Sequence, residues 1–238
     1  MAYQTALTIE NVIKDIDAKK YLLPSIQREF VWSTKQIEKL FDSLMMDYPI
    51  NGFLFWKVPK HKTREFSFYE FLRNYNQRTD RHNPKANING SDDIIAILDG
   101  QQRMTSLYIG LKGSYAYKMS HKRWDNPQAY PVRKLYLNVL GGSDDSDLTY
   151  DFRFLTDTEV KDMNGQKDLA GNALYFWYKV GDILDINEEY QVNEILIRHG
   201  LNSHPNFIFA KDLQTDSIIW CHKKRFDYKL LLGRKHRT

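Results

Sequence analysis

Cysteine and long apolar runs are both scarce in this sequence, and each shortage narrows what the protein can be. Cys221 is the single cysteine among 238 residues, which excludes an intrachain disulfide framework and a zinc or iron–sulfur site built from several cysteines. No run approaches the 18 apolar residues of a membrane-spanning helix. The first fifteen residues include acidic side chains and no apolar core segment, so they are not a secretory signal. We therefore expect a soluble, cytoplasmic protein.

Common catalytic motifs are missing as well. The chain has no GxxxxGK[ST] phosphate-binding loop, since residues 110–114 have a different pattern. The seven histidines are scattered and show no metal-ligand pairing. Asp144, Asp145 and Asp147 could hold a cation, but a solvated hairpin turn is the simpler explanation.

Positive charge is concentrated in residues 222–238. This tail has seven Lys or Arg residues and one acidic residue, Asp227, for a net charge of +6. Since the whole chain has a formal net charge of +4, residues 1–221 sum to −2. The tail could follow the phosphate backbone of a nucleic acid, or be a solvated end, or mark a place where a longer chain was cut.

The remaining composition is that of a folded protein, with 42% hydrophobic and 14% aromatic residues. Capping residues and apolar spacing predict helices after Thr8, Ser33, Gly100 and Thr156, and another over 187–199. Apolar runs and alternation predict extended segments at 19–24, 53–56, 94–98, 135–139, 148–154 and 173–180. Residues 73–93 are polar and rich in asparagine, which indicates a mobile loop or lid. We expect a mixed chain with one main core.

The turn after the apolar run 94–98 is the first candidate site. Asp99 and Gly100 lead into a helix that begins with Gln101, Gln102 and Arg103. A helix N-terminus favours a bound anion, and glycine lets the backbone approach a ligand closely. A cation in the first turn opposes the helix dipole, and a bound phosphate would remove that conflict. The alternative is an ion pair between Arg103 and a nearby carboxylate such as Asp99.

A second candidate segment covers residues 24–32. Gln27 and Arg28 precede Phe30 and Trp32, and arginine beside aromatic rings can bind phosphate while a ring stacks on a base. The alternative is that Trp32 lines the core and Arg28 covers it.

Together these segments resemble a known family. Pro24-x-x-Gln27-Arg28-x-Phe30-x-Trp32 is followed by a helix with Asp42-Ser43, then by Tyr48-Pro49-Ile50 and the strand that contains Phe55-Trp56. Ile97-Leu98-Asp99-Gly100-Gln101-Gln102-Arg103 then runs into Thr105-Ser106-Leu107. This order and spacing is similar to the N-terminal domain of GmrSD-type restriction endonucleases, which belong to modification-dependent and other anti-phage defence systems.

The resemblance implies an α+β fold of the ParB/sulfiredoxin-like kind, with a mixed sheet core and surrounding helices. It also implies binding and hydrolysis of a nucleoside triphosphate with Mg²⁺, in order to regulate DNA cleavage. The implied nucleotide-binding residues are Gln27, Arg28, Trp32, Asp99, Gly100 and Arg103. The implied catalytic residues are Asp99, Gln101, Gln102 and Arg103, with Asp99 as the metal ligand.

The resemblance also suggests a domain division and a hypothesis for function. Residues 1–185 would form the nucleotide-binding domain, and residues 186–238 a helical extension with a basic tail. A Phe-x-Arg-x-Asn-type motif of the family and its HNH-type nuclease segment have no counterpart in this sequence. We therefore expect a regulatory domain that partners DNA or a separate nuclease domain or subunit. Two alternatives remain, a non-catalytic DNA-binding or adaptor module and a remnant without a ligand.

Overall fold

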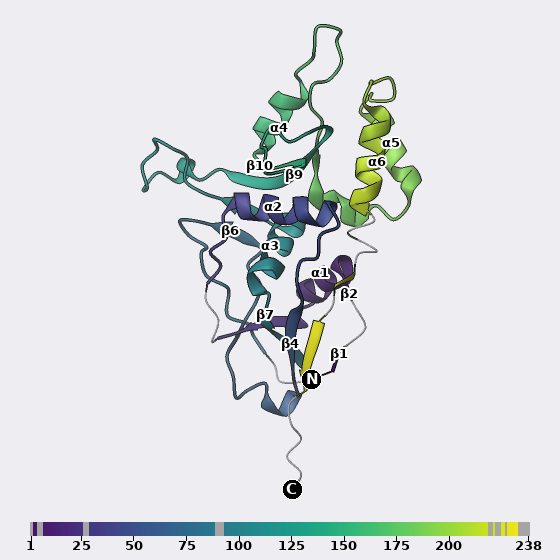
Figure 1. The fold of residues 1–238 in the computed structure, drawn as a ribbon. Helices are drawn as coiled ribbons and strands as arrows, with labels where there is room; N and C mark the ends of the chain where they lie inside the picture. Colours follow the sequence, from purple (N-terminus) through teal and green to yellow (C-terminus); the bar gives the residue numbers. More distant parts are fainter. Residues whose placement is uncertain are drawn as a thin grey trace.

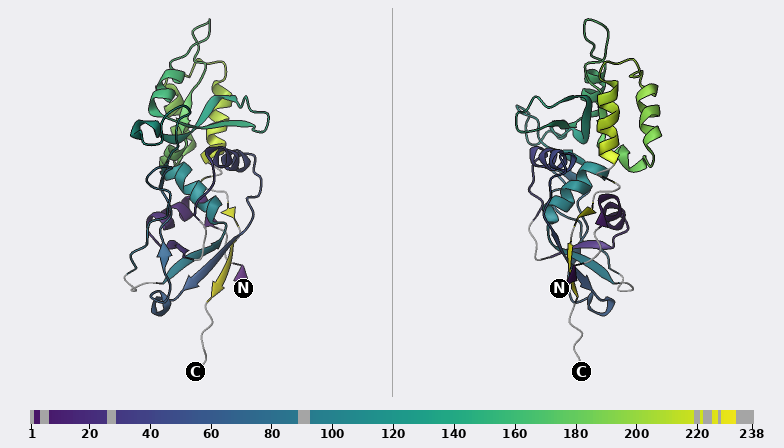
Figure 2. Two further views of the ribbon diagram at one scale, coloured as in Figure 1. Left: turned by 90° about the vertical axis from the view of Figure 1, so that its left-hand side faces the viewer. Right: turned by 45° about the vertical axis from the view of Figure 1, so that its right-hand side comes forward.

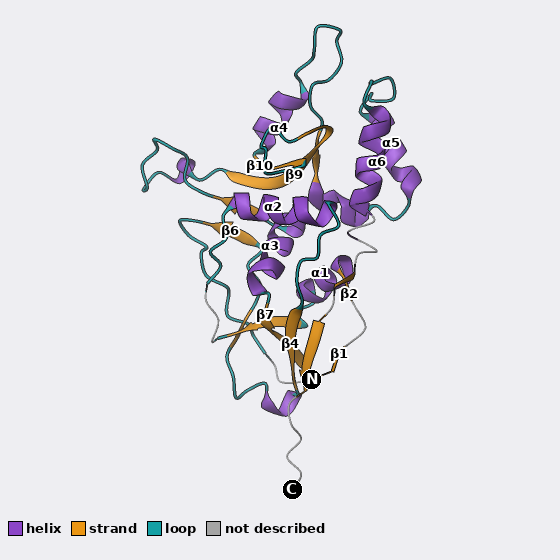
Figure 3. Cartoon of the chain, viewed as in Figure 1, coloured by secondary structure: helices purple, strands orange, loops and turns teal. Residues whose placement is uncertain are grey.

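The chain folds into two mixed β-sheets with helices between and beside them (Figures 1 and 3). This computed structural model describes residues 2–3, 7–25, 29–88, 93–218, 221, 225–226 and 228–232. The expected α+β class is confirmed. Within the described part of the chain, no helix is long and apolar enough to cross a membrane.

The first sheet has six strands and combines segments from the two ends of the chain. Its spatial order is β1 (Ala2–Tyr3), β13 (Tyr228–Leu232), β4 (Phe53–Val58), β7 (Ile94–Asp99), β3 (Tyr21–Pro24) and β5 (Phe68–Tyr69). The pairs β13–β4 and β3–β7 are parallel, whereas β4–β7 is antiparallel. A separate short antiparallel pair joins β12 (Arg225–Phe226) to β2 (Leu7–Thr8).

The second sheet lies on the other side of the helical layer (Figure 3). Its order is β10 (Tyr150–Leu155), β9 (Val132–Gly142), β8 (Ser114–Ala116) and β6 (Asn74–Asn76), with β11 (Trp177–Lys179) also paired to β9. The pair β9–β10 is the expected hairpin, with a register shift between Tyr150 and Phe152.

Three helices occupy the space between the sheets: α1 (Ile9–Asp17), α2 (Thr34–Met45) and α3 (Gln101–Lys112). Met104, Leu107 and Ile109 of α3 are all fully buried, so this helix is apolar around much of its circumference and lies in the core. The others are α4 (Asp157–Asn164), α5 (Glu189–Arg198) and α6 (Phe207–Ile218), and Figure 2 shows α5 and α6 side by side. Short 3₁₀ turns cover Lys60–Lys62, Pro127–Ala129 and Val180–Asp185.

Two carboxylates one turn apart join α2 to the second sheet. The Glu38 Oε1 atom accepts a hydrogen bond from the Phe154 amide at 3.0 Å. Asp42 Oδ1 accepts bonds from the amides of Thr149 and Tyr150 at 3.0 and 2.8 Å. Both carboxylates are buried, and such charge-assisted bonds to backbone N–H groups are stronger than neutral ones. They place α2 against β10.

Most of the expected elements are confirmed at the residues that predicted them. Thr8 caps α1, and the capping boxes at Ser33 and Thr156 open α2 and α4. The expected loop at 73–93 is wrong in one part, because Asn74–Asn76 forms β6 and pairs in parallel with β8. Its residues 89–92 lie outside the described part of the chain.

The division at residue 185 stays a prediction. Its second part contains the expected α5, and also α6, β12 and β13. In the basic tail, Lys223, Lys224, Arg234, Lys235 and Arg237 lie outside the described residues, so its contact with nucleic acid also stays a prediction.

Glu38 predicts a pH dependence of stability. Burial raises the pKa of this carboxyl above its ordinary value of 4.5, and the nearby Lys35 only partly opposes the shift. The folded state therefore binds the Glu38 proton more tightly than the unfolded state does. The stability that this proton contributes is fully present below the pKa of the unfolded state, and it is lost as the pH rises through the pKa of the folded state. We expect the melting temperature of Glu38→Gln to rise relative to that of wild type as the pH increases from 4.5 to 8, because glutamine stays neutral at both pH values.

The control is Glu194→Gln, at an exposed position on α5. Its melting temperature should differ from that of wild type by the same small amount at both pH values. A constant difference for Glu38→Gln as well would contradict the prediction.

Candidate functional site

The predicted strand–turn–helix is present at the junction of β7 and α3. Gly100 is the helix N-cap residue, with φ of +86°, and no side chain caps this N-terminus. A Cβ atom at position 100 would lie 2.4 Å from Cδ1 of Phe53. Glycine is therefore required both by the left-handed backbone and by the ring packed against it. The amide dipoles at the start of α3 point toward the turn without a capping oxygen.

The two glutamines of the turn bind to backbone groups of other segments. Gln101 is buried, and its Nε2 donates to the carbonyl oxygen of Ile97 in β7. The Gln102 amide makes a pair of bonds, with Nε2 donating to the Glu29 carbonyl at 2.9 Å and Oε1 accepting from the Val31 amide at 3.0 Å. Gln102 therefore fixes residues 29–31 against the start of α3. Their predicted roles toward phosphate or water stay predictions.

The Arg103 side chain turns back into the protein. Its guanidinium donates to the carbonyl oxygens of Ile50 and Gly52, the latter at 3.2 Å, and lies over the Phe53 ring at 4.7 Å from the centroid. It also pairs with Asp99 at 4.0 Å, which is the alternative that the sequence left open. Burial lowers the pKa of this guanidinium, and the charge of Asp99 opposes that shift. Arg103 thus positions the chain between α2 and β4, and its phosphate contact stays a prediction.

A cleft of about 390 Å³ opens at this turn. It combines the two sequence segments that were singled out as candidate sites, which lie about 70 residues apart. Its walls are formed by Val31, Trp32, Leu98, Asp99, Gly100, Gln101, Gln102 and Arg103. The other two predicted nucleotide-binding residues, Gln27 and Arg28, lie outside the described residues.

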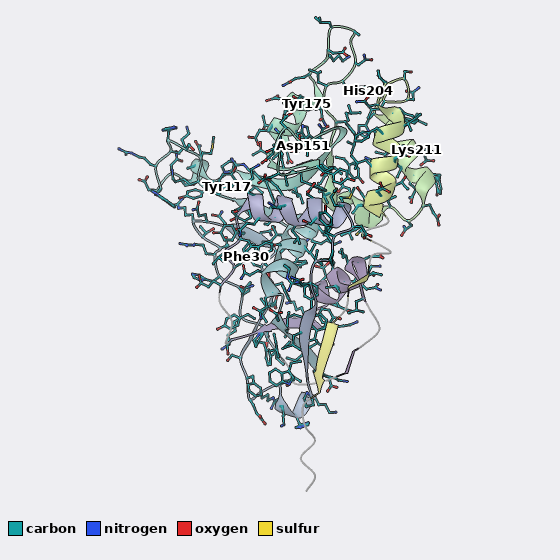
Figure 4. All side chains as sticks on the ribbon, in the orientation of Figure 1. Phe30, Tyr117, Asp151, Tyr175, His204 and Lys211 are labelled. Atoms are coloured by element: carbon teal, nitrogen blue, oxygen red, sulfur yellow. The ribbon has the colours of Figure 1, made fainter. Side chains whose placement is uncertain are left out.

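The core-lining interpretation of Trp32 is confirmed, whereas its predicted contact with a nucleotide stays a prediction. It lines the cleft, and it also packs against the main hydrophobic core. Its carbonyl oxygen accepts a hydrogen bond from the Tyr115 hydroxyl at 3.0 Å. Nearby, Phe30, which is labelled in Figure 4, is buried with its ring centroid 6.0 Å from that of Tyr75. Core packing therefore fixes the wall of the cleft.

A second hollow of about 350 Å³ shares Gln101 with the cleft. Its remaining walls come from β3 and the segment that follows it, from β5 and from the residues around position 82: Leu23, Pro24, Ser25, Glu29, Tyr69, His82 and Asn83. Glu29 and His82 lie across it, with Oε1 2.7 Å from Nδ1. Tyr69, His82 and Asn83 were not predicted as site residues, and the last two belong to the segment expected to form a mobile loop or lid. The available signal was the rings of Tyr69 and His82 and the carboxamide of Asn83.

Asp99 is the carboxylate best placed to hold a metal ion at the cleft. Its side chain is 74% exposed and lines the opening. No three His, Cys, Asp or Glu side chains gather into a metal site within the described ranges. A single carboxylate agrees with Mg²⁺, which keeps several waters and takes further ligands from substrate phosphates. Metal binding at Asp99 stays a prediction.

Comparison with known proteins identifies the class to which this fold and turn belong. Over residues 9–218 the chain matches the family described as GmrSD restriction endonuclease, N-terminal domain. This range covers most of the chain, so the chain belongs to that family, and the resemblance that the sequence motifs indicated is confirmed.

One relative comes from Methanocaldococcus jannaschii. It is an uncharacterized protein that is 30% identical to this chain over 120 residues, which is 50% of this chain. The match spans 19% of that protein's length. The matched half of this chain thus spans about a fifth of the relative, and the likeness carries no activity with it.

Gly100→Ala tests the packing of the turn. The left-handed backbone costs a residue with a Cβ atom about 1–2 kcal/mol, and the collision with Phe53 adds a similar amount. We expect a loss of roughly 2–4 kcal/mol, or about 4–16 °C in melting temperature. Gly165→Ala is the matched control, because φ there is −78° and the nearest atom is 3.4 Å away. Equal losses in both variants would refute the explanation.

Gln102→Ala tests the tie between α3 and residues 29–31. It removes two hydrogen bonds, each worth about 0.5–1.5 kcal/mol. We expect the Val31 amide to exchange faster with deuterium, as measured by hydrogen-exchange mass spectrometry on peptides that cover residues 29–31. Gln166→Ala, at an exposed position, should leave that exchange unchanged. Unchanged protection of Val31 in Gln102→Ala would show that the amide is held by other contacts.

Proposed function

We propose that this chain is a nucleotide-binding regulatory domain of a restriction or anti-phage defence protein that acts on DNA. The single observation that carries the proposal is the cleft at the β7–α3 turn. It combines an uncapped helix N-terminus, an exposed carboxylate and an aromatic side chain from a second segment. A nucleoside triphosphate needs these three features, for its phosphates, its bound Mg²⁺ and its base or sugar.

The geometry supports phosphate binding at the N-terminus of α3. Backbone N–H groups and the helix dipole favour an anion there, and no side chain caps this N-terminus. A volume of about 390 Å³ lies within the usual range for small-molecule sites. Asp99 would hold Mg²⁺, which supplies charge neutralisation for the phosphates when bound.

The remaining predicted residues are Gln27 and Arg28, which lie outside the described residues, and Arg103. Arg28, with Gln27, is proposed to contact the phosphates, since Val31 and Trp32 of the same 24–32 segment line the cleft. Arg103 is proposed to hold the turn in shape and to contribute positive charge. The ParB/sulfiredoxin-like fold belongs to the same proposal. DNA cleavage would then fall to another domain or subunit.

One observation argues against hydrolysis at the turn. The side-chain amides of Gln101 and Gln102 already make hydrogen bonds to the backbone. A glutamine that orients an attacking water needs those atoms at the moment of reaction. Nucleotide binding is therefore better supported than hydrolysis.

The test is a thermal-shift titration with ATP, GTP, CTP and UTP, each with and without Mg²⁺. A ligand at 100 times its Kd adds about 2.7 kcal/mol of stability, which is about 5–10 °C for a chain of this size. We expect such a shift for wild type with at least one nucleotide, a reduced shift for Arg28→Ala, and loss of the Mg²⁺ dependence for Asp99→Asn.

Arg198→Ala, an exposed substitution on α5, is the control and should keep the full shift. Asp99 is also mostly exposed, so Asp99→Asn should melt like wild type in the absence of ligand. No shift with any nucleotide would overturn the proposal and leave the adaptor.

A further inference from the structure

The connection between β8 and β9 projects from the second sheet as an ordered arm, here called the β8–β9 arm (residues 117–131). It extends away from the helices in Figure 1, and Figure 4 labels Tyr117 at its base. The Met119 amide donates to the Ala129 carbonyl at 2.7 Å, and the Tyr130 hydroxyl to the Trp124 carbonyl at 3.1 Å. The arm therefore holds its shape through its own contacts.

The arm exposes aromatic and apolar side chains. Trp124 is 62% exposed, and Tyr117 and Met119 are more than a third exposed. Lys118 Nζ lies 5.5 Å from the centroid of the Trp124 ring, and it donates to the carbonyls of Met119 and Lys122. Several exposed apolar groups on one projecting and ordered segment indicate a contact surface rather than chance exposure.

The same surface is positively charged. Lys118, Lys122 and Arg123 on the arm outnumber Asp125. The adjoining segment adds Arg78 and Arg81 against Asp80. The Lys118 amide of the arm donates to the Gln77 side chain of this segment at 2.9 Å, and the Gln77 amide donates to the Ala116 carbonyl of β8, also at 2.9 Å.

None of these five cations forms an ion pair with a carboxylate in the described ranges. Residues 1–221 as a whole have a net charge of −2, so this surface differs in sign from the rest of that part of the chain.

We propose that the β8–β9 arm and the Arg78–Arg81 segment form a DNA-contact surface. Cations that lack carboxylate partners can neutralise backbone phosphates and release counterions. The Trp124 ring, with Lys118 beside it, is placed to stack on a base or insert between base steps. Clustered positive charge around exposed rings matches a polyanion that also presents flat bases, and it matches an apolar protein groove poorly.

This inference adds a second surface to the nucleotide cleft and does not depend on it. The experiment measures binding of a fluorescent 20-base-pair duplex by anisotropy from 50 to 300 mM KCl, without nucleotide. The two arm variants are Lys122→Ala/Arg123→Ala and Trp124→Ala. All three positions are exposed, and melting temperatures verify that the variants fold.

The double variant should bind more weakly, and its slope of log K against log[salt] should be shallower by about 2, since each lost phosphate contact removes about 0.9. Trp124→Ala should weaken binding about 5- to 100-fold with little change in slope. Lys161→Ala/Lys167→Ala is the control for charge, and Tyr190→Ala, 60% exposed, is the control for an exposed ring. Both should bind like wild type.

A third double variant, Lys235→Ala/Arg237→Ala, separates the arm from the basic tail. The proposal expects it to retain most of the affinity. Three results would overturn the proposal: no binding of the duplex by wild type, arm variants that match the controls in affinity and slope, or loss of binding in the tail variant alone.

Discussion

The first turn of α3 is held by hydrogen bonds from three consecutive side chains, and the positions of three other segments depend on them. Gln101 binds the backbone of β7, Gln102 binds residues 29–31, and Arg103 binds residues 50–52. The backbone partners of Gln102 and Arg103 lie outside helices and strands, so side-chain groups here pair backbone atoms that regular secondary structure does not. The turn that would bind phosphate is therefore also the junction that places β7, α2 and β4 relative to one another. A substitution in it changes the shape of the site as well as its chemistry.

The elements that could be predicted from the sequence are those whose ends are encoded locally. Capping boxes at Ser33 and Thr156 predicted helix starts because the bonds form within four residues. Helix α6 was missed because its buried face includes Gln214 and Ser217, while Ile208 and Phe209 are exposed, which inverts the usual pattern. Strands β6 and β8 are only three residues long, and their pairing joins segments 40 residues apart that no local pattern connects.

The sequence could predict which residues belong to the candidate site, but it could predict only part of how they are arranged. The motif correctly placed Gly100 in a turn and the 24–32 segment beside it, because the resemblance linked two distant stretches. It did not reveal that the Gln102 amide is occupied by the backbone, since that bond depends on where residues 29–31 lie. The second hollow and the β8–β9 arm are connected through one polar segment of the chain, which no sequence motif indicates. His82 and Asn83 line it, while Gln77, five residues earlier, is bound to the β8–β9 arm.

The order of strands in the first sheet has a consequence for how the protein folds during synthesis. Strand β13 lies between β1 and β4, although it follows β1 by more than 220 residues. Until Tyr228–Leu232 has left the ribosome, β4 has an open edge and β1 lacks the strand with which it pairs. Pairings between strands this distant along the chain form slowly, because the entropy cost of closing the intervening loop comes before the stabilising contacts form. The helices and the strands of the second sheet are synthesised earlier. The first sheet, which contains β7, is therefore the last part to be completed, when β13 joins β1 to β4.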